Sequence, residues 1–188
     1  MIRNALNFIK QQLDEYLSLH FDLDESAVVI NSLLDLDGGV SKKNQNKVVV
    51  TMINLDHETS RQYSTAQRKL NSKDIAEFSP AQYFNIDLLF TANFDDYEES
   101  LKFLTRTISF FQANMSFNAN NLPGMPRGVS KLNFQIENSS FLETHNLWSA
   151  MGAKYQPSII YKIRHISIDS EQVSAIKPSV TRVAATAS

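Results

Sequence analysis

Apolar residues recur along the chain at spacings that predict three helices. The first set repeats at steps of four and three residues and consists of Ile2, Leu6, Ile9, Leu13 and Tyr16. Such spacing places them on one helical face and predicts a helix over about residues 3–19. From Tyr97, apolar residues at positions 97, 101, 104, 108 and 111 predict a second helix. A third and shorter helix carries Leu147, Trp148 and Met151.

The ends of the second and third helices are marked by polar residues. Asp95 is followed three residues later by Glu98, and Ser140 is followed in the same way by Glu143. A side chain at the helix start can accept a hydrogen bond from an unpaired amide while the glutamate reaches back. Gly152 is placed to end the third helix.

Strand patterns occupy five further stretches. They cover residues 27–30, 47–55, 84–90, 132–136 and 158–168. The first is a short apolar run typical of an edge strand, and the second is rich in β-branched residues. The third and fourth alternate apolar with polar residues, which predicts strands with one buried face. In the last stretch the alternation changes parity near Arg164, which predicts a bulge or a twist there.

Helices and strands that mix in this way predict an α/β (α+β) fold. We expect a single domain over residues 1–169, with a central mixed or antiparallel sheet flanked by an N-terminal, a central and a short third helix. Residues 170–188 are polar, small and aperiodic, which predicts a mobile C-terminal tail. Residues 57–80 lose periodicity and predict a long surface excursion. The proline-containing stretch 122–128 predicts an exposed loop.

Composition narrows the classes of function. The chain has 188 residues, which suits one domain, and a net charge of −2, which argues against a nucleic-acid binder. It contains no cysteine, so it can form neither a disulfide nor a thiolate metal site. The N-terminus lacks the apolar core of a signal peptide, and no apolar run reaches the ~18 residues of a membrane helix. We therefore expect synthesis and folding in the cytoplasm, without membrane insertion.

No motif with established chemistry is present. The glycine-containing stretch 124–131 has the wrong spacing for a phosphate loop and precedes a strand. The histidines are His20, His57, His145 and His165, and no pair has the spacing of metal ligands. The carboxylates of residues 95–99 fit the first turn of a helix, where the helix dipole favours negative charge. We expect no enzymatic activity, no cofactor and no metal.

Two longer stretches resemble a known family. Residues 92–112 form one, and residues 132–164 form the other, with the pattern of residues 147–158 as the most specific element. Together with the opening residues 1–6, they resemble the cap, or tail-terminator, proteins of phage-tail-like contractile injection systems, in particular the N-terminal domain of the extracellular injection system cap. The resemblance covers about residues 1–169.

The resemblance implies a fold like that of phage tail terminators and a structural role without catalytic residues. It implies a closed homo-oligomeric ring, with six subunits as the expected number, on the distal end of an inner tube and sheath. Such a ring would end polymerisation, link the two layers and become part of a phage-tail-like particle, either released or cell-anchored. The partners would be further copies of the chain, the sheath protein and the tube protein.

Interface residues are predicted in the long excursion and in the proline-containing loop. The candidates are His57, Arg61, Tyr63, Arg68, Leu122, Pro123, Met125 and Arg127. Both segments are longer than a connection between strands requires, so they serve as contact surfaces or are simply solvated loops. Two other hypotheses stay open at this point: a general protein-binding adaptor or scaffold, and an enzyme whose site the sequence does not reveal.

Overall fold

The computed structural model describes residues 1–35, 37–59, 66–69, 74–78, 82–118, 121–122, 124–126, 129, 131–168 and 173–178. For residues 66–69, 74–78, 165–168 and 173–178 it describes the backbone alone. The helices are α1 (Ile2–Phe21), α2 (Tyr97–Ala113) and α3 (Phe141–Met151), with a short 3-10 turn, η1 (Lys42–Asn44). All three predicted helices are therefore confirmed.

The main sheet has six strands in the order β1-β2-β5-β8-β7-β6. They are β1 (Val28–Ile30), β2 (Lys47–His57), β5 (Gln82–Asn93), β6 (Ser116–Asn118), β7 (Lys131–Ile136) and β8 (Ser158–Ile168). β1 runs parallel to β2 and every other neighbouring pair is antiparallel, so the sheet is mixed as expected. The five predicted strands are confirmed, whereas β6 was not predicted because three residues carry too little pattern.

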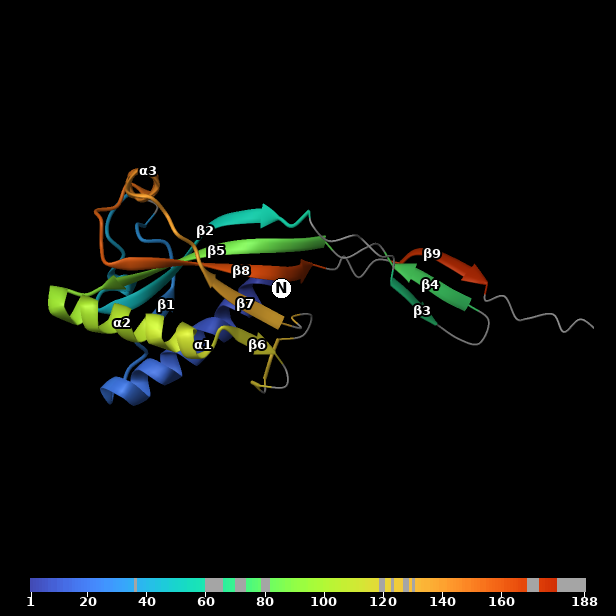
Figure 1. Ribbon diagram of the computed structural model, residues 1–188, viewed down its shortest axis with the longest axis horizontal. Coiled ribbons are helices and arrows are strands. Elements are labelled where there is room, and N and C mark those ends of the chain that lie inside the picture. Colours follow the sequence, from blue (N-terminus) through green and yellow to red (C-terminus); the bar gives the residue numbers. More distant parts are fainter. Residues whose placement is uncertain are drawn as a thin grey trace, which may run out of the picture.

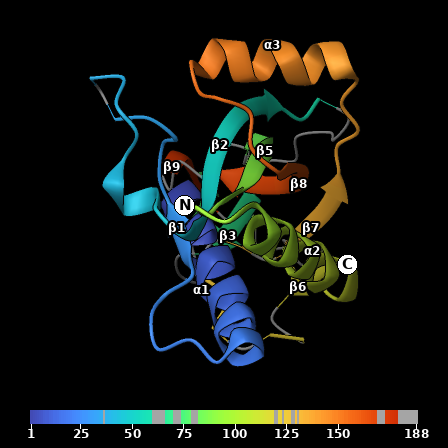
Figure 2. The same ribbon diagram turned by 90° about the vertical axis from the view of Figure 1, so that its left-hand side faces the viewer.

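The helices cover both faces of this sheet. α1 and α2 lie on one face and α3 lies on the other, as Figures 1 and 2 show. The alternation along β5 follows this division: Leu88 and Phe90 belong to the core under α1 and α2, while Leu89 faces α3. Both sets are almost fully buried, which explains why β5 is apolar along most of its length.

Three short strands form a separate sheet, in the order β3-β4-β9. They are β3 (Ala66–Lys69), β4 (Asp74–Phe78) and β9 (Val173–Pro178). In Figure 1 this small sheet lies beyond the far ends of β5 and β8. Residues 57–80, expected to be a long surface excursion, and residues 170–188, expected to be a mobile tail, therefore contain strands that the sequence patterns did not predict. Each is only four to six residues long, which is too short to show a clear period, and β9 pairs with a strand about 100 residues earlier.

The bulge predicted near Arg164 is confirmed by the register of β8. Phe84 pairs with Ile166 and Ile86 pairs with Ile163, so two residues of β8 face one residue of β5. A second bulge lies in β2, between Met52 and Asn54. Bulges of this kind change which residues face each side of a strand.

The predicted start of α2 is wrong by one residue. Asp96 is the capping residue, and its side chain accepts a hydrogen bond from the Glu98 amide. Asp95 instead accepts hydrogen bonds from the side chains of Gln45 and Asn46. At the start of α3, Ser140 and Glu143 form the predicted reciprocal pair, and Gly152 ends the helix in a left-handed conformation.

Candidate functional site

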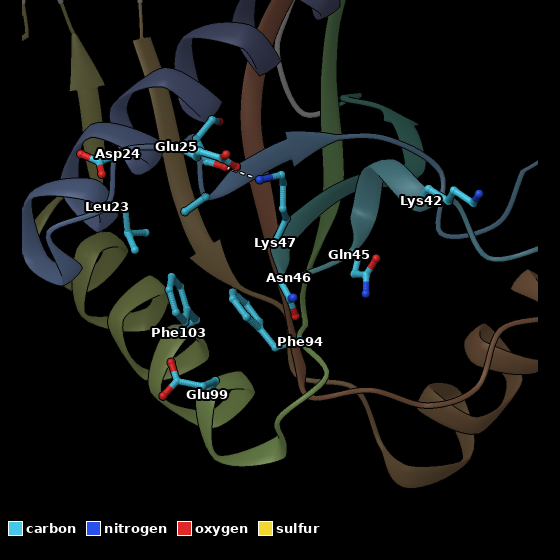
Figure 3. Close-up of a pocket in the computed structure, with 12 residues that line it drawn as sticks. Leu23, Asp24, Glu25, Lys42, Gln45, Asn46, Lys47, Phe94, Glu99 and Phe103 are labelled. Carbon is cyan, nitrogen blue, oxygen red and sulfur yellow. Dashed lines mark hydrogen bonds between the residues drawn. The ribbon is translucent and has the colours of Figure 1, made fainter.

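A broad hollow opens where the loop after α1, the start of β2 and the first turn of α2 meet (Figure 3). Its volume is about 700 Å³. Phe94 and Phe103 stack on its wall with ring centroids 4.2 Å apart, and Lys47 Nζ donates a hydrogen bond to the Ser26 carbonyl over 2.6 Å. Histidine and cysteine do not occur among the residues that line it. The hollow therefore lacks the side chains that most often act as general base or thiol nucleophile.

The hydroxyl of Ser26, on the rim of this hollow, is held by charged neighbours. It donates to Asp14 over 2.6 Å and accepts from Lys10 Nζ over 3.1 Å. Lys10 Nζ also pairs with Asp14, at 3.2 Å, so the three side chains are hydrogen-bonded to one another. The other oxygen of Asp14 accepts the amides of Ala27 and Val28 over 2.7 and 3.1 Å. The cluster thus joins α1 to β1.

The protonation of Asp14 reflects this role. Partial burial alone would raise the pKa of its carboxyl, because it disfavours the charged form. The hydrogen bonds from Ser26, Lys10 and the Ala27 amide outweigh burial and hold the pKa below its usual value. Asp14 is therefore ionised at neutral pH and remains an acceptor for the backbone of β1.

A row of charged side chains crosses the sheet on the face that carries α3. Lys162 of β8 lies 3.9 Å from Asp56, 3.7 Å from Asp87 and 3.5 Å from Glu137. Asn54 donates hydrogen bonds to both Asp56 and Asp87. Within the described part of the chain, no group of three or more histidine, cysteine or acidic side chains could hold a metal ion. The row joins β2, β5 and β8 to the residue that follows β7.

The predicted interface residues fall into four groups. His57 is exposed at the end of β2, with its ring centroid 5.5 Å from that of Phe84. Leu122 and Met125 are half-buried and both pack against the main core, so the structure brings these two to the same region. For Arg68, in β3, only the backbone is described. Arg61, Tyr63, Pro123 and Arg127 lie outside the described residues.

Exposed apolar side chains mark surfaces that the sequence reasoning missed. Met52 and Leu55 in β2 are 44% and 41% exposed, and Met115 and Ile136 near the opposite edge of the sheet are 66% and 48% exposed. Phe141, in the first turn of α3, is 90% exposed. For Met52 and Leu55 the sequence offered a weak signal, because the alternation of β2 breaks between them.

A comparison with protein-family models matches residues 5–182 to the Pvc16 N-terminal domain. The chain belongs to the Pvc16 N-terminal domain family. The resemblance seen in the sequence is thereby confirmed. A search of curated protein sequences found no significant match to this Pvc16-type domain.

Two solved structures share the fold of the Pvc16-type domain along its whole length. One is the sheath/tube terminator of an extracellular contractile injection system, PVC, in the extended state, with a TM-score of 0.69 and 14% identity. The other is the tube-terminating cap of the anti-feeding prophage, with a TM-score of 0.58 and 13% identity. The chain spans 63% and 59% of the lengths of these two proteins. Among its described helices, none combines the length and the apolar character needed to cross a membrane.

Proposed function

We propose that the chain is a terminator subunit of a contractile injection system. In this role it forms a closed ring, with six copies as the expected number, on the distal end of the inner tube and sheath. The observation that carries the proposal is the likeness of the whole chain to the PVC sheath/tube terminator and to the anti-feeding prophage cap. The ring is made in the cytoplasm and becomes part of the assembled particle.

A ring of this kind solves a physical problem of tubular polymers. Tube and sheath subunits add through contacts that do not close along the polymer axis, so their own surfaces set no end to growth. A ring that matches the last layer on one face and offers no matching surface on the other stops addition. The ring also links the two layers if it contacts both, and it needs no enzymatic activity or cofactor to do so.

The segments predicted as contact surfaces belong to this proposal. They are the stretch from His57 to Ser79, with Arg61, Tyr63 and Arg68, and the loop with Leu122, Pro123, Met125 and Arg127. Deletion of part of the first segment should impair capping while the six-stranded body stays folded. An equal deletion in residues 179–188 is the matched control. Normal capping by the shortened chain, with circular dichroism unchanged, would reject this contact surface.

The direct test is electron microscopy of particles from a strain that lacks this chain. We expect aberrant tube length, contracted sheath or few intact particles, and recovery when the intact chain is supplied from a plasmid. Uniformly long particles that still contract on stimulation would reject the terminator role. The alternative, a protein-binding adaptor or scaffold, would then lead, and it predicts a monomer or dimer rather than a ring in light scattering.

A further inference from the structure

Among the described residues, the outer edge of β2 is open beyond residue 50. The amide of Val48 and the carbonyl of Val50 bond on the side of β1, which ends at that level. Alternate residues of a strand direct their backbone N–H and C=O groups to the same side, so the backbone groups of Met52 point away from β5. After the bulge the Glu58 amide bonds on the side of β5. Counting back in steps of two from the neighbouring residue, the backbone groups of Leu55 therefore point away from β5. Among the described strands, β5 alone pairs with β2 beyond residue 50.

The opposite edge of the sheet is open as well. β6 pairs with residues 131–133 of β7, and the amide of Phe134 still bonds to the Met115 carbonyl. The amide of Glu137 bonds to β8, so the backbone groups of Ile136 face outward. In the described part of the chain, no strand pairs with β7 on this outer side after residue 133.

Met52 at the first open edge and Ile136 at the second belong to one row of directly paired residues across the sheet, and both lie on the same face. Met52 pairs with Leu88, Leu88 pairs with Tyr161, and Tyr161 pairs with Ile136. Directly paired residues share a face, and Leu88 and Tyr161 belong to the core under α1 and α2. Met52 and Ile136 therefore both lie on the face that carries these two helices. Leu55 lies on the same face, because it pairs with Ile86 of that core.

A groove beside the β7 edge can receive apolar side chains. It runs between α2 and β7, has a volume of about 490 Å³ and is lined in part by Ile108, Gln112, Met115 and Ile136. All its lining side chains are uncharged. An added strand gains affinity from main-chain hydrogen bonds and specificity from such pockets for its side chains.

We propose that the open β2 edge of one copy adds to the open β7 edge of a second copy. The two strands are antiparallel, because β2 and β8 run in the same direction and β7 runs against both. Met52 and Leu55 of the first copy enter the groove beside Ile136 of the second. The partner of each edge is a second copy of the chain, because one chain carries both the β2 edge and the β7 edge, and the open residues of the two edges lie on the same row of the sheet. The joint repeats head to tail and closes into a ring when the rotation allows it. The inference gives a contact for the ring of the proposed function and rests on it.

Cysteine cross-linking tests this joint directly, because the chain contains no cysteine of its own. Paired residues on antiparallel strands have Cα atoms about 4.5–5.5 Å apart, within the range of a disulfide. The full-length double variants are Met52→Cys with Ile136→Cys and, for a small shift of register, Leu55→Cys with Ile136→Cys. After mild oxidation, at least one should give a ladder of covalent oligomers on a non-reducing gel. Each single variant can give at most dimers.

The matched control combines Leu19→Cys with Ile136→Cys, since Leu19 is 80% exposed and lies on α1, in neither edge strand. The inference is overturned if neither test pair gives a stronger ladder than this control. It is also overturned if the single Met52→Cys variant dimerises as well as the test pair forms a ladder, since that would indicate symmetric pairing. Uncapped particles in the deletion strain without a ladder would reject this joint and keep the terminator role. A ladder together with normal particles in that strain would support this joint and reject the terminator role.

Discussion

Replacement of Trp148 by alanine tests how α3 is held on the sheet. Trp148 is the buried residue of α3, 4% exposed, and its ring meets that of Tyr155 at a centroid distance of 5.4 Å. Its indole nitrogen is buried without a hydrogen-bond partner among the described residues, so the substitution removes packing and no hydrogen bond. Truncation of a large buried aromatic costs about 3–5 kcal/mol. We expect a loss in this range, against a typical domain stability of about 5–15 kcal/mol.

The same structure predicts where the damage occurs. Trp148 is not part of the core between the sheet and the helices α1 and α2. In Trp148→Ala, α3 should leave the sheet first, expose Leu89 and lower solubility, while α1 and α2 stay packed.

The assay combines urea unfolding, followed by circular dichroism, with hydrogen exchange of residues 141–151. Trp148→Phe is the control, since it keeps an aromatic ring and should lose clearly less stability. A Trp148→Ala protein within about 1 kcal/mol of the parent and defective only in assembly would refute the reasoning. Trp148 would then be an interface residue.

Three further predictions concern single features. Asp14→Ala should lose at least about 1.5–3 kcal/mol in urea unfolding, the contribution of one hydrogen bond to a charged group, because the amides of both Ala27 and Val28 lose their acceptor. The pKa of Asp14 is lowered in the folded state, so its contribution is present above the ordinary value of 3.8 and is lost as the pH falls below it; an acid titration of Asp14→Asn should lack this step. Ser140→Ala should lose about 1 kcal/mol through its cap, and equal stability in the same assay would contradict the capping role. A chelator should leave the melting temperature unchanged, and a drop of several degrees would indicate a metal site.

Local patterns made the helices and most of the main sheet predictable. The start of α3 depends on four consecutive residues, so Ser140 and Glu143 were sufficient to identify it. The start of α2 offered two adjacent aspartates, and the choice between them depended on Gln45 and Asn46, which lie about 50 residues earlier. Contacts between distant segments decide such cases, and a local pattern does not contain them.

The remaining features depend on tertiary pairing. β9 pairs with β4, about 100 residues earlier in the chain, and its six residues are too few to show a strand pattern by themselves. The row around Lys162 arises because side chains from four separate segments meet around its ammonium group. The open edges could not be read from the sequence either, since they depend on where the neighbouring strands β1 and β6 end.

The two open edges also separate the ring from the adaptor hypothesis. An adaptor needs one edge for its partner, whereas a head-to-tail ring needs two edges that match. Natural proteins usually protect an open edge with charged residues, proline or a bulge. β2 has a bulge next to Met52, yet the outward-facing residues of the two edges, Met52 and Ile136, are apolar and 44% and 48% exposed. Met52→Asp should block one edge and Ile136→Asp the other, so each variant alone should be monomeric. An equimolar mixture should form dimers and nothing larger, because each variant keeps the edge that the other lacks. Light scattering at matched concentrations measures this. Dimers of either variant alone, or a mixture that stays monomeric while the parent chain forms a ring, would show that these edges do not pair head to tail.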